Sequence, residues 1–268
     1  MCGILRQKEN PMCEIFGSCS KKYCELNDYL KEFYSHSHKH PHGWGLALLE
    51  GSEASIEKEP MEAIKSDYLK ERLKTPVIGR NALAHIRYAT IGNVEYVNCH
   101  PYTMKANSGR RWTLVHNGTI FGYKPLDKYV AIQTGDTDSE RILLYITEQM
   151  NRAEASAKRE LNADERFRLM DDIFVSMSKG NKLNILIYDG ELMYIHTNYA
   201  KSLYFLQTGE RVTFSTQPLS EEGWQPVPFT RLLAYKDGEQ MFLGTDHGNV
   251  YVDTEENLKY LYQIFSNL

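Results

Sequence analysis

Residues 12–17 read MCEIFG, a short apolar run that stops at a glycine. Its side chains suit a pleated, half-buried surface, so the run predicts a buried strand. Residues 20–35 carry apolar side chains three and four positions apart, which indicates an amphipathic helix. The polar segment SHSHKHPHGWG (35–45) is predicted to be a loop that leads into a second strand at 46–49.

The remaining segments fall into two groups of strands separated by two consecutive helices. Helical periodicity is found at 60–74, 138–151 and 163–178, and the last dozen residues predict a terminal helix. Strand patterns bounded by turn residues cover 77–90, 110–120, 182–198, 202–209 and 211–219. This order of elements predicts an α+β fold with two packed sheets and helices outside them.

Composition limits the class of protein. With 268 residues, 42% of them apolar, and no linker rich in Pro, Gly or Ser, the chain can form one large domain. The net charge is −4 and the basic residues are dispersed, which argues against a nucleic-acid partner. The sequence contains neither a bilayer-spanning apolar run nor the apolar core of a signal peptide. Its five cysteines are an odd number, so we expect a cytoplasmic protein with a free thiol.

Cys13 follows a methionine, so removal of the residues before it would make it the first residue of the chain. The α-amine of a terminal cysteine, with a pKa of about 7.7–8.0, can take the proton of its own thiol, whose pKa is about 8.5. One residue would then supply both nucleophile and base. The alternative is that the Met-Cys pair arises by chance and the cysteine is a small buried side chain.

Two downstream segments carry groups that amide hydrolysis needs. In HIRYAT (85–90), alternation along the strand separates Arg87 from its neighbours, and a guanidinium at a strand end can hold a carboxylate through two hydrogen bonds. In HNGT (116–119), the amide of Asn117 and the backbone N–H of Gly118 can donate to one developing negative oxygen. A surface ion pair and a tight hairpin turn are the respective structural alternatives.

A third segment, GDTDSE (135–140), opens a predicted helix. One of its acids or Thr137 can cap that helix, while the other acid can bind an ammonium group. Helix capping alone explains the segment equally well. The order of the segments along the chain therefore matters more than any one of them.

In this order, MCEIFG, GWG, HIRYAT, NCHPY, VHNGTI and GDTDSE resemble the class II glutamine amidotransferases, N-terminal-nucleophile hydrolases that take ammonia from glutamine. The resemblance is specific from Met12 to about Glu140, weaker up to residue 224, and closest to small members that consist of the glutaminase domain alone. It implies a four-layer αββα sandwich of two mostly antiparallel sheets that uses no metal or cofactor. It also implies that a thiolate attacks the amide and that water releases glutamate from a γ-glutamyl thioester.

The resemblance also implies roles for residues of this chain. Cys13 would be the nucleophile, and Asn117 with the backbone N–H of Gly118 would form the oxyanion hole. Arg87 and Thr90 would hold the α-carboxylate of glutamine.

The same resemblance places Asp138 on the α-ammonium of glutamine, and His100 and Trp44 in the shell that supports the pocket. A hydrolase of another γ-glutamyl amide would use the same groups. Since 268 residues hold no synthase domain, a separate chain would have to accept the ammonia.

A second Met-Cys pair, ending at Cys2, also resembles a family start, and only one of the two cysteines can be terminal. Cys13 precedes Trp44 by 31 residues, close to the family spacing, whereas Cys2 would need an insertion. The residues after Cys2 are polar and broken by Pro11, which cannot continue a buried strand. We therefore expect Cys13 as the nucleophile, and residues 1–12 as a propeptide or the product of an unused upstream start.

Four histidines alternate ahead of GWG: His36, His38, His40 and His42. An extended chain would point all four to one side and offer them to zinc, nickel or copper, which makes a metal-binding protein the rival hypothesis. Pro41 and Gly43 interrupt the run, and no Cys-x-x-Cys motif or acidic partner lies nearby in the sequence. We therefore expect a polar loop.

Overall fold

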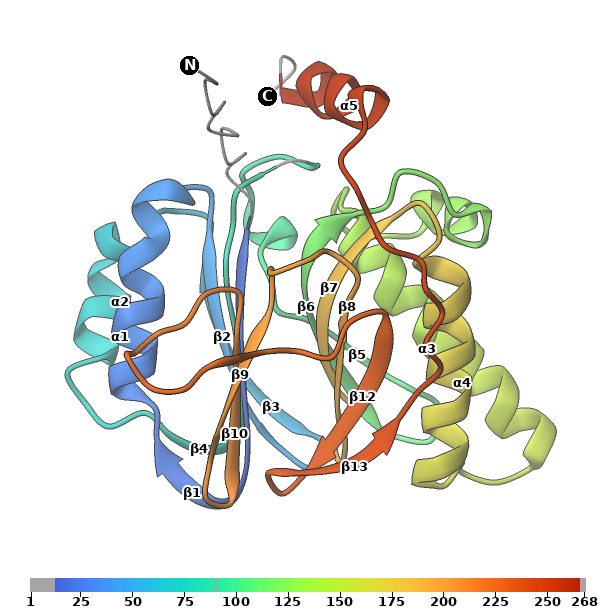
Figure 1. Ribbon diagram of the computed structural model, residues 1–268, viewed down its shortest axis with the longest axis horizontal. Helices are drawn as coiled ribbons and strands as arrows, with labels where there is room; N and C mark the ends of the chain where they lie inside the picture. Colours follow the sequence, from blue (N-terminus) through green and yellow to red (C-terminus); the bar gives the residue numbers. More distant parts are fainter. Residues whose placement is uncertain (1–12, 90, 266–268) are drawn as a thin grey trace, which may run out of the picture.

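The computed structural model describes residues 13–89 and 91–265. They form a seven-stranded and a six-stranded sheet that pack face to face, with helices on both outer sides (Figure 1). The strands that pair in both sheets are antiparallel. The predicted four-layer αββα sandwich of the α+β class is confirmed. No helix within these residues is long and apolar enough to cross a bilayer.

The first sheet holds its longest strand, β1, between β10 and β4. In spatial order its strands are β11 (Gln225–Pro226), β9 (Tyr204–Thr208), β10 (Arg211–Ser215), β1 (Glu14–Glu25), β4 (Ile78–Ile86), β2 (Trp44–Glu50) and β3 (Glu53–Glu59). On its outer side lie the helical segments α1 (Asn27–Ser35), η1 (His36–Lys39), η2 (Ala63–Lys65) and α2 (Asp67–Arg72).

The second sheet holds β6 and β7 side by side. In spatial order its strands are β13 (Glu239–Leu243), β12 (Arg231–Lys236), β8 (Met193–Thr197), β7 (Lys182–Tyr188), β6 (Arg111–Thr119) and β5 (Tyr102–Lys105). On its outer side lie the helices α3 (Asp138–Ala157) and α4 (Ala163–Met177). The remaining helical segments are η3 (Tyr96–Asn98), η4 (Lys124–Ala131) and α5 (Glu255–Phe265).

Three layers of apolar side chains hold these elements together. Ile15 and Leu186 belong to the layer between the sheets, whereas Phe16 packs against α1 on the outer side of the first sheet. Ile142 and Phe174 pack α3 and α4 onto the second sheet. Since successive residues of β1 alternate between two of these layers, both faces of the strand are buried. Each large apolar side chain buried in this way contributes about 1.5–3 kcal/mol.

The predicted helix over 20–35 was wrong in its first part. β1 continues to Glu25, and α1 begins only at Asn27. The residues after Cys19 pair with β10 and, after a register shift, with β4. Pairing on both sides of a central strand outweighs the local helical periodicity, which the sequence shows but the pairing partners do not reveal.

The other helix predictions agree more closely with the structure. α3 and α4 begin at residues 138 and 163 as predicted, and Asn162 forms a reciprocal capping box with Glu165 at the start of α4. The predicted helix at 60–74 is divided into η2 and α2. Ser66 separates the two, because its hydroxyl accepts from the N–H of Leu69 (3.0 Å) and caps α2.

A buried carboxylate fixes the start of β1. The Glu14 oxygens lie 2.8 Å from His36 Nδ1 and 3.1 Å from His40 Nε2, and accept from the side-chain nitrogen of Gln217 (2.8 Å). Only 1% of Glu14 is exposed. A buried carboxylate is costly unless it is paired, so these three contacts hold η1 and the segment after β10 against the first residue of β1.

The alternating histidines therefore do not point to one side. The chain turns through η1 instead of running extended, which sends His36 and His40 to Glu14. His38 contacts the carbonyl of Ser35 at the surface, and His42 accepts from the N–H of Ala89. The described residues hold no group of three or more His, Cys, Asp or Glu able to bind a metal ion. The fold brings Glu14, which lies 22 and 26 residues away in the chain, to His36 and His40 as their acidic partner.

We predict that Glu14→Gln destabilises the protein more at pH 5.5 than at pH 8.5. The hydrogen bond to Glu14 raises the pKa of His36, so this contribution is complete below pH 6.5 and is lost as pH rises through the raised value. Burial would raise the pKa of Glu14, but the two histidines outweigh it and lower that pKa, so its contribution is lost only in acid. Urea unfolding at pH 5.5 should show a loss of about 1–3 kcal/mol.

The matched control is Glu32→Gln, which removes an exposed partner of His36 at 3.5 Å. An exposed pair of this kind contributes about 0–1 kcal/mol, so the control should differ little from the parent chain. Equal destabilisation by Glu14→Gln at both pH values would contradict an ion pair between Glu14 and His36.

Candidate active site

Cys13 lies directly before β1, which begins at the upper end of the first sheet in Figure 1. Its sulfur accepts from the N–H of Tyr88 (3.2 Å), and the thiol also lies 3.2 Å from the Tyr88 carbonyl oxygen. Burial raises the pKa of the thiol to about 11, although Arg87 acts in the opposite direction. The thiol is therefore protonated at neutral pH, and a nucleophile at this position needs a base beside it.

The start of β1 faces the ends of β6 and β7 across the space between the sheets. Gly17 lies against Leu186, since a Cβ atom on Gly17 would come within 2.8 Å of Leu186 Cδ1. Two residues further along β1, Cys19 pairs with Asn81 of β4, and Asn81 donates to the hydroxyl of Tyr188 in β7 (3.4 Å). A step of two residues in β1 thus corresponds to a step of two residues in β7, from Leu186 to Tyr188, so the two strands run in the same direction. The residue before β1 is therefore level with the start of β7.

Asn117 points into the same space as Cys13. Asn117 alternates with Val115 in β6, Cys13 alternates with Ile15, and both Val115 and Ile15 belong to the layer between the sheets. Only 1% of Asn117 is exposed, yet its side-chain nitrogen has no hydrogen-bond partner among the described residues. Leaving a buried donor unpaired costs about 1–3 kcal/mol, which suits a group reserved for a ligand.

The neighbouring strand provides a contrast. Asn184, which pairs with Asn117 in register, donates from its side-chain nitrogen to Ser202 (2.8 Å). Among the buried asparagines that the structure describes, only Asn117 leaves this nitrogen unpaired. At Gly118 a Cβ atom would collide with the backbone oxygen of Lys182, so a larger residue does not fit without a backbone shift.

Arg87 is buried and organises the loop that follows β4. Its guanidinium donates to three backbone carbonyls, those of Asn93 (2.7 Å), Ile91 (2.9 Å) and Gly92 (2.7 Å). The surface ion pair considered from the sequence is therefore wrong. Thr90, the predicted partner of Arg87 on the substrate carboxylate, lies outside the described residues, as does Cys2.

The start of α3 resolves which group caps that helix. Thr137 is the cap, because its hydroxyl accepts from the N–H of Glu140 (3.2 Å). The carboxylate of Asp138 instead accepts from the N–H of Ile120 (2.8 Å), one residue after the end of β6. This hydrogen bond holds Asp138 next to the end of β6, which carries the candidate oxyanion donors. The charge of Asp138 also raises the pKa of the Cys13 thiol.

His100 and Trp44 lie on different sides of the first sheet. His100 stacks on His85 with ring centroids 4.1 Å apart, and burial lowers both pKa values well below the usual range, so both rings are neutral. Trp44 lies in the layer facing α1 and donates to Glu59 (3.0 Å). The structure therefore does not bring Trp44 into the space between the sheets.

Sequence reasoning missed two charged residues at this edge. Glu14 and Lys182 each begin a strand whose other residues are largely buried. A charged residue at the first position of such a strand was the available signal, since a buried charge needs a specific partner. The partners of Glu14 lie 22, 26 and 203 residues away, which sequence spacing does not reveal.

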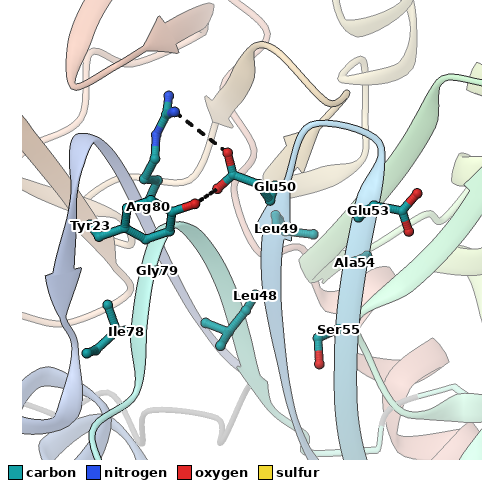
Figure 2. A pocket seen from close by; sticks show the side chains of 10 residues that line it. All are labelled: Tyr23, Leu48, Leu49, Glu50, Glu53, Ala54, Ser55, Ile78, Gly79 and Arg80. Carbon is teal, nitrogen blue, oxygen red and sulfur yellow. Dashed lines mark hydrogen bonds and ion pairs between the residues drawn. The ribbon is translucent and has the colours of Figure 1, made fainter.

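A surface pocket lies at the other end of the first sheet (Figure 2). Tyr23 donates to Glu50 (3.0 Å) at its rim, and Arg80 approaches the same carboxylate at 3.6 Å. Gly79 lines this pocket, whereas Tyr88, nine residues later in the chain, contacts the candidate nucleophile Cys13. Nine residues of extended chain span about 30 Å, so the pocket is far from Cys13. The lining residues labelled in Figure 2 include none of the predicted site residues.

The predicted groups thus meet at one edge of the sandwich. A thiol, a buried unpaired amide donor, a guanidinium and a carboxylate converge there from β1, β6, β4 and α3. Such a set can perform nucleophilic attack on an amide carbonyl and stabilise the resulting oxyanion.

Comparison with known proteins agrees with this geometry. Residues 12–210 match the family model of the class II glutamine amidotransferases. An uncharacterised protein of Methanocaldococcus jannaschii is 28% identical over 259 residues, which cover 86% of this chain and 71% of that protein.

Two solved structures share the fold. A "predicted glutamine amidotransferase" of Pseudomonas aeruginosa superposes with a TM-score of 0.61 at 18% identity, over 86% of this chain and all of that one. The glutamine phosphoribosylpyrophosphate amidotransferase of Bacillus subtilis also gives 0.61, at 19% identity, over 85% of this chain but only 48% of its own length. The chain therefore belongs to the class II glutamine amidotransferases, which are enzymes.

Proposed function

We propose that this protein hydrolyses the side-chain amide of glutamine, or of a related γ-glutamyl compound, with Cys13 as an N-terminal nucleophile. The observation that carries the proposal is the buried, unpaired side-chain nitrogen of Asn117, which faces the space that Cys13 also faces. A donor in this position has no partner among the described residues, and it can bind an oxygen that becomes negative during the reaction.

The proposal requires that residues 1–12 are absent from the active form, either as a propeptide or as an untranslated leader. The α-amine of Cys13 then supplies the base that the buried thiol needs. Two observations support Cys13 over Cys2: the family match begins at residue 12, and Cys13 directly precedes the central strand β1. We propose residues 13–268 as one catalytic domain.

The reaction proceeds in two halves. The α-amine takes the thiol proton, and the sulfur attacks the amide carbon to give a tetrahedral oxyanion bound by Asn117 and the N–H of Gly118. The C–N bond then breaks, and the α-ammonium gives its proton to the departing ammonia or amine. In the second half the α-amine activates a water, which attacks the γ-glutamyl thioester and releases glutamate and the thiol. These steps use no metal or cofactor.

The remaining site residues hold the glutamyl part of the substrate. We assign Arg87 and Thr90 to the α-carboxylate and Asp138 to the α-ammonium, with His100 as a supporting residue; Trp44, on the outer side of the sheet, receives no role in the pocket. The five N–H groups of a guanidinium exceed the three carbonyls that Arg87 contacts, so Arg87 can hold its loop and a carboxylate together. Ammonia released from glutamine would pass to a synthase domain or partner.

Asn117→Ala should lower kcat for glutamate release by about 10²–10³ with little change in KM, because the lost donor acts mainly on the oxyanion. Steady-state kinetics of the chain beginning at Cys13 measure both constants. Asn107→Ala, an exposed asparagine in the turn before β6, is the matched control and should leave kcat unchanged. A kcat within threefold of the parent value would remove Asn117 from the oxyanion hole.

The chain beginning at Cys13 should release glutamate from glutamine, whereas a chain that retains residues 1–12 should not. In the longer chain the amine of Cys13 is part of a peptide bond and cannot act as a base. Activity of the shorter chain should rise with pH through about 7.7–8.0, the range of a free α-amine. Intact mass spectrometry establishes the first residue of each sample.

Cys13→Ser in the shorter chain is the companion variant, because it keeps the amine but removes the thiol. Its glutamate release should fall to background. Full activity in a sample whose mass begins at Met1 or Cys2 would refute the assignment of Cys13.

A further inference from the structure

Lys182 is a buried cation that the reaction above does not use. It is the first residue of β7, with only 3% of its surface exposed. Its ammonium nitrogen lies 3.4 Å from the ring centroid of Tyr199 and 5.7 Å from that of Tyr251. Tyr199 follows β8, and Tyr251 belongs to the segment that leads to α5. Aromatic faces stabilise a cation in this arrangement.

The register of the strands places Lys182 beside the candidate oxyanion hole. β6 and β7 pair Asn117 with Asn184 and Thr119 with Lys182, so these four side chains face the space between the sheets. Lys182 is two residues from Asn184, which is about 7 Å along the strand. Because β1 and β7 run in the same direction, Lys182 is also level with Cys13 across a gap of about 10 Å.

The charge of Lys182 is not needed for glutamine. Glutamine has one carboxylate, for which Arg87 is the proposed partner, and one ammonium, for which Asp138 is the proposed partner. A second cation on the sheet that faces Cys13 suits a substrate with a second anionic group. If the glutamyl part is held by Arg87 and Asp138, the second anion belongs to the group on the amide nitrogen.

We propose that Lys182, Tyr199 and Tyr251 form a subsite for a carboxylate on the amine side of the scissile bond. The preferred substrates would then be γ-glutamyl amino acids or peptides rather than glutamine. This inference rests on the proposed hydrolysis of γ-glutamyl amides. It specifies that the site prefers leaving groups that carry a carboxylate.

The surroundings of Lys182 favour binding of an anion. Burial lowers the pKa of Lys182 to about 7, and Asp253 acts in the opposite direction. Among the residues that the structure describes, Tyr199, Tyr251 and Asp253 are titratable groups close to Lys182, and burial raises the pKa of both tyrosines. Near pH 7 a carboxylate would therefore draw a proton onto Lys182 and form an ion pair that little water screens.

The competing structural explanation is that Lys182 only braces the segment before α5. Tyr251 donates its N–H to the carbonyl of Asn198 (2.8 Å), and the Tyr199 hydroxyl donates to Asp253 (3.1 Å), so this segment is already joined to the sheet. A bracing role would affect every substrate alike. A subsite would affect acidic leaving groups alone.

Comparison of γ-glutamylglycine with γ-glutamyl methylamide separates these explanations, because both substitute the amide nitrogen but only the first adds a carboxylate. The chain beginning at Cys13 should show a higher kcat/KM for γ-glutamylglycine. Lys182→Met should reduce that constant by about 10- to 100-fold, as expected for loss of a charged hydrogen bond, and change the methylamide constant by less than threefold. Lys179→Met, an exposed lysine before β7, is the control and should change neither.

A pH profile tests the same subsite in the unsubstituted chain, so the outcome does not depend on folding of a variant. The ratio of the two kcat/KM values should fall about tenfold per pH unit above pH 7, as Lys182 loses its proton. Equal losses on both substrates in Lys182→Met, or a ratio that is near one and constant between pH 6 and 9, would overturn the subsite while leaving the hydrolase intact. Absence of hydrolysis of glutamine and both amides would refute the proposed function itself.

Discussion

The position of β1 is the constraint on which the rest of the site depends. The strand lies in the middle of the first sheet, paired on both sides and buried on both faces, so its register cannot slip without moving apolar side chains into the wrong layer. Its first residue is a buried carboxylate that is paired with His36, His40 and Gln217. Cys13 is therefore held in one position, opposite the last residues of β6 and the first residues of β7.

The second sheet supplies the opposite half of the arrangement. Most buried amides near the site are used in folding, as Asn184 and Asn198 show through their side-chain hydrogen bonds. Asn117 departs from that pattern, and its unpaired nitrogen stores a cost that a bound oxygen can relieve. Asn117 and Asp138 lie on a strand and at a helix start, and Cys13 and Arg87 each lie directly beside the end of a strand, which keeps these groups close to the geometry that the reaction needs.

The fold class and the two long helices could be predicted from the sequence, and so could the residues that we propose for the site. These features rest on local periodicity, capping residues and short ordered motifs that resemble a family. The extension of β1 to Glu25 and the direction of the alternating histidines depended on contacts that local patterns do not contain. Thr137 was one of several candidate caps, and the competing Asp138 is instead held by Ile120, 18 residues earlier. His40, for example, pairs with Glu14, which lies 26 residues earlier in the chain. Lys182 contacts the rings of Tyr199 and Tyr251, which lie 17 and 69 residues later.

We propose Cys13 as the nucleophile of this amidotransferase fold, and a reactive substrate analogue tests that assignment directly. A glutamine analogue with a diazoketone in place of the amide should alkylate the attacking thiol, and peptide mass spectrometry then locates the label. We expect one label per chain, on the peptide that begins with Cys13, and protection by γ-glutamyl substrates. Labelling of Cys19, Cys24 or Cys99 instead, or equally fast labelling of Cys13 in a chain that retains residues 1–12, would contradict it.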